Sequence, residues 1–109
     1  MNILFICSKN KWRSRTAETI FSKSQNHTVF SAGTDHDARI KLTEKLLQKA
    51  DMVFVMEKKH RDIIRQKFPE FSNPKEIIIL NIPDEYQYMD EELIEILKTS
   101  VSGYISDIL

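Results

Sequence analysis

The chain has one cysteine, Cys7, and an arginine, Arg13, follows it six residues later. A thiolate can attack phosphorus directly, and the planar guanidinium group of an arginine can hold two phosphate oxygens while charge shifts onto them. Five residues separate the two side chains, which is enough for a loop to curl around one phosphate group with the thiol below and the guanidinium beside it. The spacing therefore predicts chemistry at a phosphoryl group.

The residues between Cys7 and Arg13 can direct successive backbone N–H groups inward and so form a nest for an anion. This stretch contains no glycine, and Asn10 is the residue in it that is best able to adopt a left-handed conformation. Ser14 can cap the following helix or donate its hydroxyl to the thiolate, and both roles stay open. The predicted phosphate-binding loop comprises Ser8, Lys9, Asn10, Lys11, Trp12 and Ser14.

Basic residues alternate through this loop, at Lys9, Lys11, Arg13 and Arg15. They favour the attraction of an anionic ligand, and together with a helix N-terminus they favour the thiolate form of a cysteine. Two simpler interpretations stay open. The basic residues can be solvated surface, and a lone cysteine after a strand can be a buried small hydrophobic residue.

Apolar runs and helical periodicity predict the elements that position this loop. Strands are predicted at 2–6, 28–31, 52–56 and 77–80, and helices at about 14–24, 43–49, 58–67 and from about 90 onward. Apolar strands that alternate with helices indicate a parallel sheet covered on both faces. We therefore expect residues 1–109 to form a single three-layer α/β domain, with a four-stranded parallel sheet and helices on both faces.

The carboxyl ends of the strands are where such sheets bind ligands. Cys7, Gly33, Glu57 and Asp84 each follow a predicted strand, so we expect them to share one rim of the molecule.

Asp84 is the candidate for a further role, because a displacement at phosphorus needs a proton for the leaving oxygen and a carboxylic acid can supply it. Pro83 stiffens this segment, and Tyr86 offers an aromatic surface for an aryl leaving group. Taken alone, Pro83-Asp84 is more typical of a simple turn before a helix than of a catalytic acid.

Composition narrows the class of protein. The formal net charge of the 109 residues is zero, which gives no overall signature of nucleic-acid binding. No uninterrupted apolar run is long enough to span a bilayer, and the first residues follow a strand pattern rather than an export signal. A single cysteine agrees with a reducing compartment. We expect a cytoplasmic protein that does not associate with membranes.

Several groups of residues, taken in order along nearly the whole chain, carry a resemblance. They are Cys7-(x5)-Arg13-Ser14 with Ala17-Glu18 and Phe21, Ser31-Ala32-Gly33-Thr34, His36-x-Ala38-Arg39, residues 50–56 (ADMVFVM) and Pro83-Asp84-x-Tyr86. In this order they resemble the low-molecular-weight protein tyrosine phosphatase family.

The resemblance implies that Cys7 is a nucleophile that forms a phosphocysteine intermediate, that Arg13 clamps the phosphate, and that Asp84 is a general acid and then a base toward water. It also implies a phosphotyrosine-containing protein as substrate, Tyr86 in the substrate pocket, and neither a metal nor another cofactor. Four polar residues match positions that support the phosphate loop in the family: Asn10, Ser14, Ser31 and His36.

The chain departs from the family pattern at the pocket. Between Thr34 and His36 the family inserts about one helix and a loop that form a wall of the phosphotyrosine pocket, whereas this chain has only Asp35, so we expect a more open pocket. Lys9 replaces a glycine and Trp12 replaces a second cysteine. Because no neighbouring thiol can protect Cys7 as a disulfide, we expect its oxidation by peroxide to be poorly reversible.

Other functions stay open. The basic loop also suits a nucleotide or RNA phosphate as substrate, although nucleic acid is not the expected partner. A phosphoryl carrier with a cysteine after its first strand would not need Arg13 or Asp84, and a thioredoxin-coupled arsenate reductase would need more cysteines than this chain has. A non-catalytic module would bind phosphate without turnover. The patterns do not determine the oligomeric state.

Overall fold

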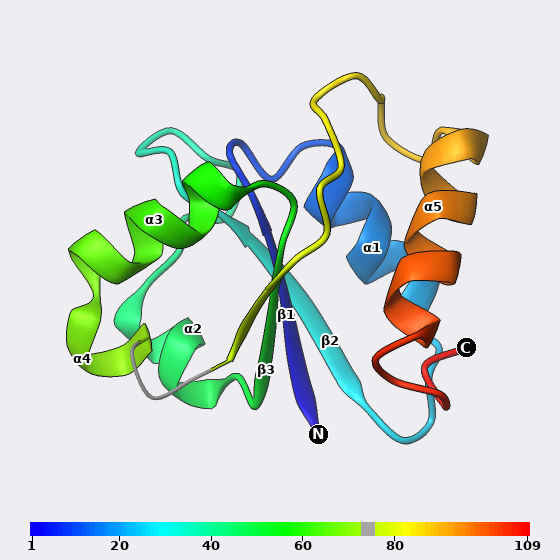
Figure 1. Cartoon of the computed structure of the whole chain (residues 1–109), viewed down its shortest axis with the longest axis horizontal. Coiled ribbons are helices and arrows are strands. Elements are labelled where there is room, and N and C mark those ends of the chain that lie inside the picture. Colours follow the sequence, from blue (N-terminus) through cyan, green and yellow to red (C-terminus); the bar gives the residue numbers. More distant parts are fainter. Residues whose placement is uncertain (73–75) are drawn as a thin grey trace.

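Four strands alternate with helices in the computed structural model, which describes residues 1–72 and 76–109 (Figure 1). The strands are β1 (Asn2–Cys7), β2 (Thr28–Gly33), β3 (Met52–Val55) and β4 (Ile77–Ile79). The helices are α1 (Arg13–Phe21), α2 (Glu44–Lys49), α3 (Lys58–Lys67), α4 (Pro69–Ser72) and α5 (Glu91–Ser102).

The strands form one parallel sheet in the order β2-β1-β3-β4. Parallel strands need a crossover between them, and the helices provide these crossovers. Cys7, the last residue of β1, is paired with Gly33, the last residue of β2. The predicted parallel sheet is confirmed, and its carboxyl ends meet at one edge.

Alternating side chains of β1 supply the cores on the two faces of the sheet. Ile3, Phe5 and Cys7 belong to the cluster that α1 and α5 cover, whereas Leu4 and Ile6 belong to the cluster under α2 and α3. Figure 1 shows α1 and α5 on one side of the sheet and the other helices on the opposite side. Helices therefore cover both faces, and the predicted three-layer architecture is confirmed.

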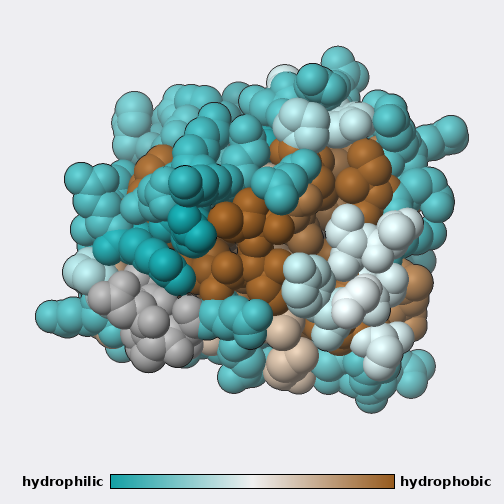
Figure 2. All heavy atoms as spheres, in the orientation of Figure 1, coloured by the Kyte–Doolittle hydropathy of each residue, from teal (hydrophilic) through white to brown (hydrophobic). Residues whose placement is uncertain are grey.

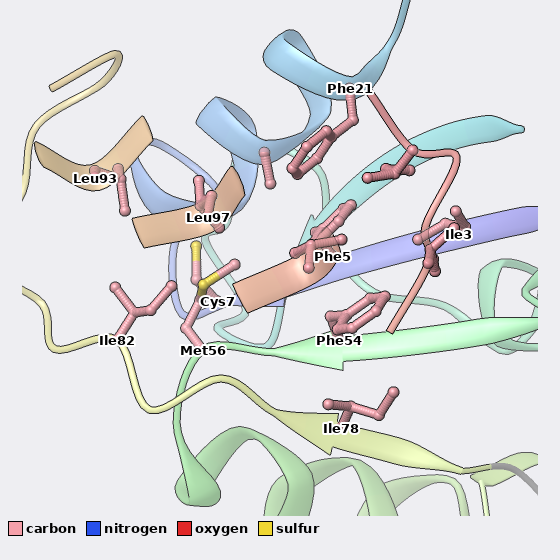
Figure 3. Packing of buried hydrophobic residues seen from close by; sticks show 14 residues of the cluster. Ile3, Phe5, Cys7, Phe21, Phe54, Met56, Ile78, Ile82, Leu93 and Leu97 are labelled. Carbon is pink, nitrogen blue, oxygen red and sulfur yellow. The ribbon is translucent and has the colours of Figure 1, made fainter. Parts of the chain in front are cut away.

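Aromatic packing dominates the face toward α1 and α5. The Phe5 ring stacks on Phe21 with centroids 5.6 Å apart and on Phe54 with centroids 5.2 Å apart. All three side chains are fully buried, and each such burial stabilises the fold by roughly 1.5–3 kcal/mol. Figure 3 shows Cys7 at one end of this core, beside Met56. Cys7, the candidate nucleophile, is therefore held in place by closely packed, buried side chains.

Helix boundaries follow local capping. The prediction of a helix over 58–67 is confirmed, and Asp90 begins α5 by accepting hydrogen bonds from the backbone N–H groups of Glu92 and Leu93. The prediction of a helix to residue 24 is wrong. Helix α1 ends at Phe21, because the Ser22 hydroxyl bonds to the Thr19 carbonyl and the chain turns there.

The short helix α4 is an element that the periodicity does not predict. Pro69 follows the end of α3 closely and is the first residue of α4. A proline is tolerated at the first position of a helix, because its missing N–H would have no partner within the helix there.

Strand β4 is at one end of the strand order. On the face drawn in Figure 2, hydrophobic residues gather in the middle, with hydrophilic residues to the left and above them and residues of intermediate hydropathy to the right. Ile79, the last residue of β4, and Leu80 after it are half-buried. Among the residues that the structure describes, no helix combines the length and the apolar character needed to cross a membrane.

Candidate active site

The loop between β1 and α1 begins at Cys7 and ends at Arg13. Asn10, near its middle, has φ 58° and is completely buried. Asparagine tolerates this left-handed conformation better than most residues, and the prediction for Asn10 is confirmed. The turn at Asn10 brings its own backbone N–H to within 3.3 Å of Cys7 Sγ.

Two hydrogen-bonding groups converge on the Cys7 sulfur. Besides the Asn10 N–H, the Ser14 hydroxyl lies 2.9 Å from Sγ. Ser14 Oγ also accepts a hydrogen bond of 2.7 Å from Asn10 Nδ2. The Ala32 carbonyl also lies 3.5 Å from Ser14 Oγ. When Cys7 is a thiolate it can only accept, so the Ser14 hydroxyl is then the donor in the shorter contact with the sulfur. Hydrogen bonds of this kind stabilise a thiolate, which is the form of cysteine that acts as a nucleophile.

The Arg13 side chain is buried, and one of its terminal nitrogens, Nη1, makes two hydrogen bonds within the protein. Its Nη1 donates to Glu57 Oε2 over 2.6 Å and to the Ile82 carbonyl over 2.8 Å. Its Nε lies 3.7 Å from Asp84 Oδ1. The three N–H groups on Nε and Nη2 form the edge of the guanidinium that can bind two oxygens of a phosphate.

Glu57 joins this site from the N-terminus of α3. Burial raises the pKa of the Glu57 carboxyl, but the hydrogen bond and the charge of Arg13 outweigh burial and bring that pKa below its ordinary value. Glu57 is therefore ionised at neutral pH and orients the Arg13 guanidinium.

The segment after β4 brings Asp84 to the opposite side of the loop. Ile82 anchors this segment, because its N–H donates to the Met56 carbonyl over 2.8 Å while its own carbonyl accepts from Arg13. The Asp84 side chain, two residues on, is 56% exposed. The resulting cavity has a volume of about 300 Å³ and is lined by Cys7, Ser8, Lys9, Lys11, Trp12, Arg13 and Asp84.

The short segment around Asp35 packs against the outside of the loop. The Asp35 N–H donates to the Ser8 carbonyl, and the Arg39 side chain donates to the Asn10 carbonyl over 2.9 Å. The Lys9 ammonium forms ion pairs with Asp37 at 2.7 Å and Asp35 at 3.2 Å. The lysine that replaces the expected glycine therefore ties this segment to the loop.

Three of the predicted residues lie elsewhere than expected. Tyr86 does not line the cavity: it packs against the core on the α5 side, where burial and Glu92 raise the pKa of its phenol. Ser31 donates to the Glu18 carboxylate on α1 instead of supporting the loop. His36 is exposed.

The histidine that contacts the loop is His60, which the sequence pattern did not single out. Its Nε2 lies 2.9 Å from Ser8 Oγ, and the ring is completely buried. The sequence pattern predicts that Glu57 lies on the rim but predicts no role for it. The aromatic side chain that lines the cavity is Trp12. The sequence offered one indication that Glu57 and His60 could contribute to the site, which was their position just after the third strand.

Comparison with solved structures identifies the fold. SP-PTP, a low molecular weight protein tyrosine phosphatase from Streptococcus pyogenes, is similar with a TM-score of 0.80 at 14% sequence identity, over 99% of this chain and 93% of that one. Wzb from Vibrio vulnificus, in complex with benzylphosphonate, is similar with a TM-score of 0.77 at 23% identity, over 94% of this chain and 95% of that one.

YwlE from Bacillus subtilis is similar with a TM-score of 0.71 at 22% identity, over 97% of this chain and 99% of that one. A further YwlE structure is described as an arginine phosphatase, in a cysteine-to-serine mutant with a phosphorylated active-site serine. No family model matches the sequence, and no curated protein matches it. The chain has the fold of the low-molecular-weight protein tyrosine phosphatases.

Proposed function

We propose that the protein is a phosphatase that hydrolyses phosphate monoesters through a phosphocysteine intermediate, with phosphotyrosine in proteins as its substrate class. The observation that carries the proposal is the single cavity of about 300 Å³ that Cys7, Arg13 and Asp84 line together. A cysteine that is buried only for packing would need neither the N–H groups of Arg13 beside it nor the Asp84 carboxylate on the other side of a cavity. The similar fold of known tyrosine phosphatases supports this proposal.

The reaction has two displacements at phosphorus. First, the Cys7 thiolate bonds to phosphorus, the bond from phosphorus to the leaving oxygen breaks, and that oxygen takes a proton from Asp84. Water then attacks the phosphocysteine, Asp84 accepts a proton from the water, and the sulfur–phosphorus bond breaks. Inorganic phosphate leaves and the thiolate is restored. Arg13 and the loop N–H groups hold the phosphoryl oxygens throughout.

Trp12 and Lys11 support an aryl phosphate as substrate. The Trp12 side chain is 45% exposed and lines the cavity, so an aromatic ring attached to the phosphate can stack against it. Lys11 also lines the cavity, and its positive charge attracts a phosphate dianion while it repels a cationic leaving group such as the guanidinium of phosphoarginine.

Hydrolysis of p-nitrophenyl phosphate in the presence of a metal chelator tests the chemistry. We expect turnover by the wild-type protein and none by Cys7→Ser, because the serine hydroxyl is a far weaker nucleophile at neutral pH. Asp84→Asn should slow hydrolysis of phenyl phosphate, whose leaving group needs a proton, more than that of p-nitrophenyl phosphate. General acid catalysis is typically worth about 10²–10⁴-fold.

Glu85→Gln is the matched control, since Glu85 is exposed beside Asp84 but does not line the cavity. Its kinetics should equal those of the wild type. Undiminished activity in Cys7→Ser would end the proposal, and binding of phosphate without any turnover would instead identify a phosphate-binding module.

A panel of phosphorylated compounds tests the substrate class. Phosphate release is compared for peptides that contain phosphotyrosine, phosphoserine or phosphoarginine, and for a nucleoside monophosphate. The phosphotyrosine peptide should give the highest kcat/KM. Preference for the nucleotide or for phosphoarginine would contradict the proposed substrate class but not the phosphocysteine chemistry.

A further inference from the structure

The hydroxyl of Ser8 and the ring of His60 form a hydrogen-bonded pair that joins the phosphate-binding loop to α3. Ser8 Oγ lies 2.9 Å from His60 Nε2, and Ser8 lines the cavity above Cys7. His60 is completely buried and does not line the cavity. The ring therefore touches the loop from behind and has no direct access to a ligand.

The other ring nitrogen of His60 determines the direction of this hydrogen bond. His60 Nδ1 accepts the backbone N–H of Glu57 over 3.1 Å, as the third residue of a helix does in a capping box. A neutral imidazole carries one proton. Because Nδ1 is the acceptor, the proton is on Nε2, which must donate it to Ser8 Oγ.

The Ser8 hydroxyl is consequently an acceptor toward His60 and keeps its own proton for another partner. A hydroxyl has one proton to donate, and the hydrogen bond with His60 leaves it free. Ser8 lines the cavity, so its hydroxyl can turn this proton toward the cavity. There the proton can be donated to an oxygen of a phosphoryl group held above Cys7.

We propose that Ser8 is a phosphate-binding side chain and that His60 is its positioning residue, fixing the Ser8 hydroxyl so that its proton faces the phosphoryl group. The inference rests on the proposed function for the identity of the ligand. Two residues at the N-terminal cap of α3 then orient side chains of the site. The Glu57 carboxylate orients Arg13, and the His60 ring orients Ser8.

Binding of inorganic phosphate, measured by calorimetry, tests the pair without requiring turnover. Loss of a hydrogen bond to a charged group should weaken phosphate binding roughly 10- to 100-fold in Ser8→Ala. His60→Leu should produce a loss of similar size. In the double variant, His60→Leu should add little to the loss in Ser8→Ala, because the ring acts through the hydroxyl.

Two conservative variants and one control separate positioning from general damage. Ser8→Thr keeps a hydroxyl and His60→Gln keeps both an acceptor and a donor, so both should retain most of the affinity. Thr34→Val is the matched control, because the buried Thr34 hydroxyl has no hydrogen-bond partner among the residues that the structure describes. Its phosphate binding should not change.

Steady-state kinetics add a second readout. Loss of the Ser8 contact should raise KM and the inhibition constant of phosphate together. Two outcomes would overturn the inference. One is a loss of phosphate affinity in the double variant that equals the product of the two single losses, and the other is normal phosphate binding by a folded Ser8→Ala protein. Normal phosphate binding by a wild-type protein that hydrolyses no substrate would overturn only the proposed phosphatase activity.

Discussion

His60 is neutral because of where its ring lies. Burial lowers the pKa of His60 to about 4, and the nearby charge of Arg13 acts in the same direction. Lys59 adds to this effect, whereas the carboxylates of Glu57 and Asp35 oppose it. A protonated ring would also place a second N–H against the Glu57 N–H that Nδ1 accepts. The burial of the ring and its hydrogen bond at the start of α3 therefore both favour neutral His60.

This neutral state predicts how stability depends on pH. Between pH 6.5, the ordinary pKa, and about pH 4 the unfolded chain binds a proton at His60 that the folded protein does not. Stability must therefore fall as pH falls through this window. The slope should be steeper in the wild type than in His60→Gln by up to about 1.4 kcal/mol per pH unit, the limit for one proton.

Urea denaturation at several pH values between 6.5 and 4 measures the two slopes. The other titrating groups near the ring, including Glu57, are present in both proteins, so the comparison isolates the histidine. Equal slopes for the two proteins would contradict the prediction, because His60 would then bind its proton equally well in the folded and the unfolded chain.

At the scale of elements, β2 approaches the phosphate-binding loop so closely that only a glycine fits at its end. A Cβ atom on Gly33 would lie 2.4 Å from the Ser8 carbonyl oxygen and 2.6 Å from Ala38 Cβ. The first of these is backbone and cannot swing away. We expect Gly33→Ala to destabilise the protein by roughly 1–3 kcal/mol, as overpacking does, and to weaken phosphate binding by displacing Ser8.

The second glycine of the chain provides the control for this prediction. A Cβ on Gly103 would have an ordinary contact of 3.4 Å with the Ser100 carbonyl. Gly103 ends α5 with a helical backbone conformation, so Gly103→Ala should be neutral or slightly stabilising. Thermal or urea denaturation of both variants measures the difference. Equal stability of the two variants would contradict the close approach at Gly33.

The sequence predicted the elements and the loop because the signals for both are local. Strand runs, helical periodicity and the spacing from Cys7 to Arg13 span few residues, and the left-handed turn at Asn10 follows from residue type. The contributions of α3 depend on contacts over long separations. Arg13 meets Glu57 across 44 positions and Ser8 meets His60 across 52, and no local pattern specifies such pairs.

Side-chain orientation was the other information that the sequence lacked. Tyr86 and Trp12 were both near the site in sequence, but which ring faces the cavity depends on how the segment after β4 packs. That packing buries part of Tyr86 in the core beside α5 and leaves Trp12 at the cavity. The His36 side chain is likewise exposed, and its residue type alone did not predict that orientation.

The whole molecule contains one thiol, and this determines its response to oxidation. Cys7 is the only cysteine among the 109 residues. Peroxide converts a thiolate to a sulfenic acid, which a second thiol can trap as a disulfide before further oxidation. No such thiol exists in this chain, so continued exposure should carry Cys7 to the sulfinic acid, which dithiothreitol does not reduce.

We therefore expect activity to be lost with time in excess peroxide, and the fraction that dithiothreitol restores to decrease as exposure lengthens. Mass spectrometry should find two added oxygens on the peptide that contains Cys7. Inorganic phosphate should slow the loss, because it occupies the cavity above the sulfur, and Thr34→Val should react like the wild type. Full recovery of activity after long exposure would contradict this prediction, since it would require a protecting bond that the single thiol cannot form within one chain.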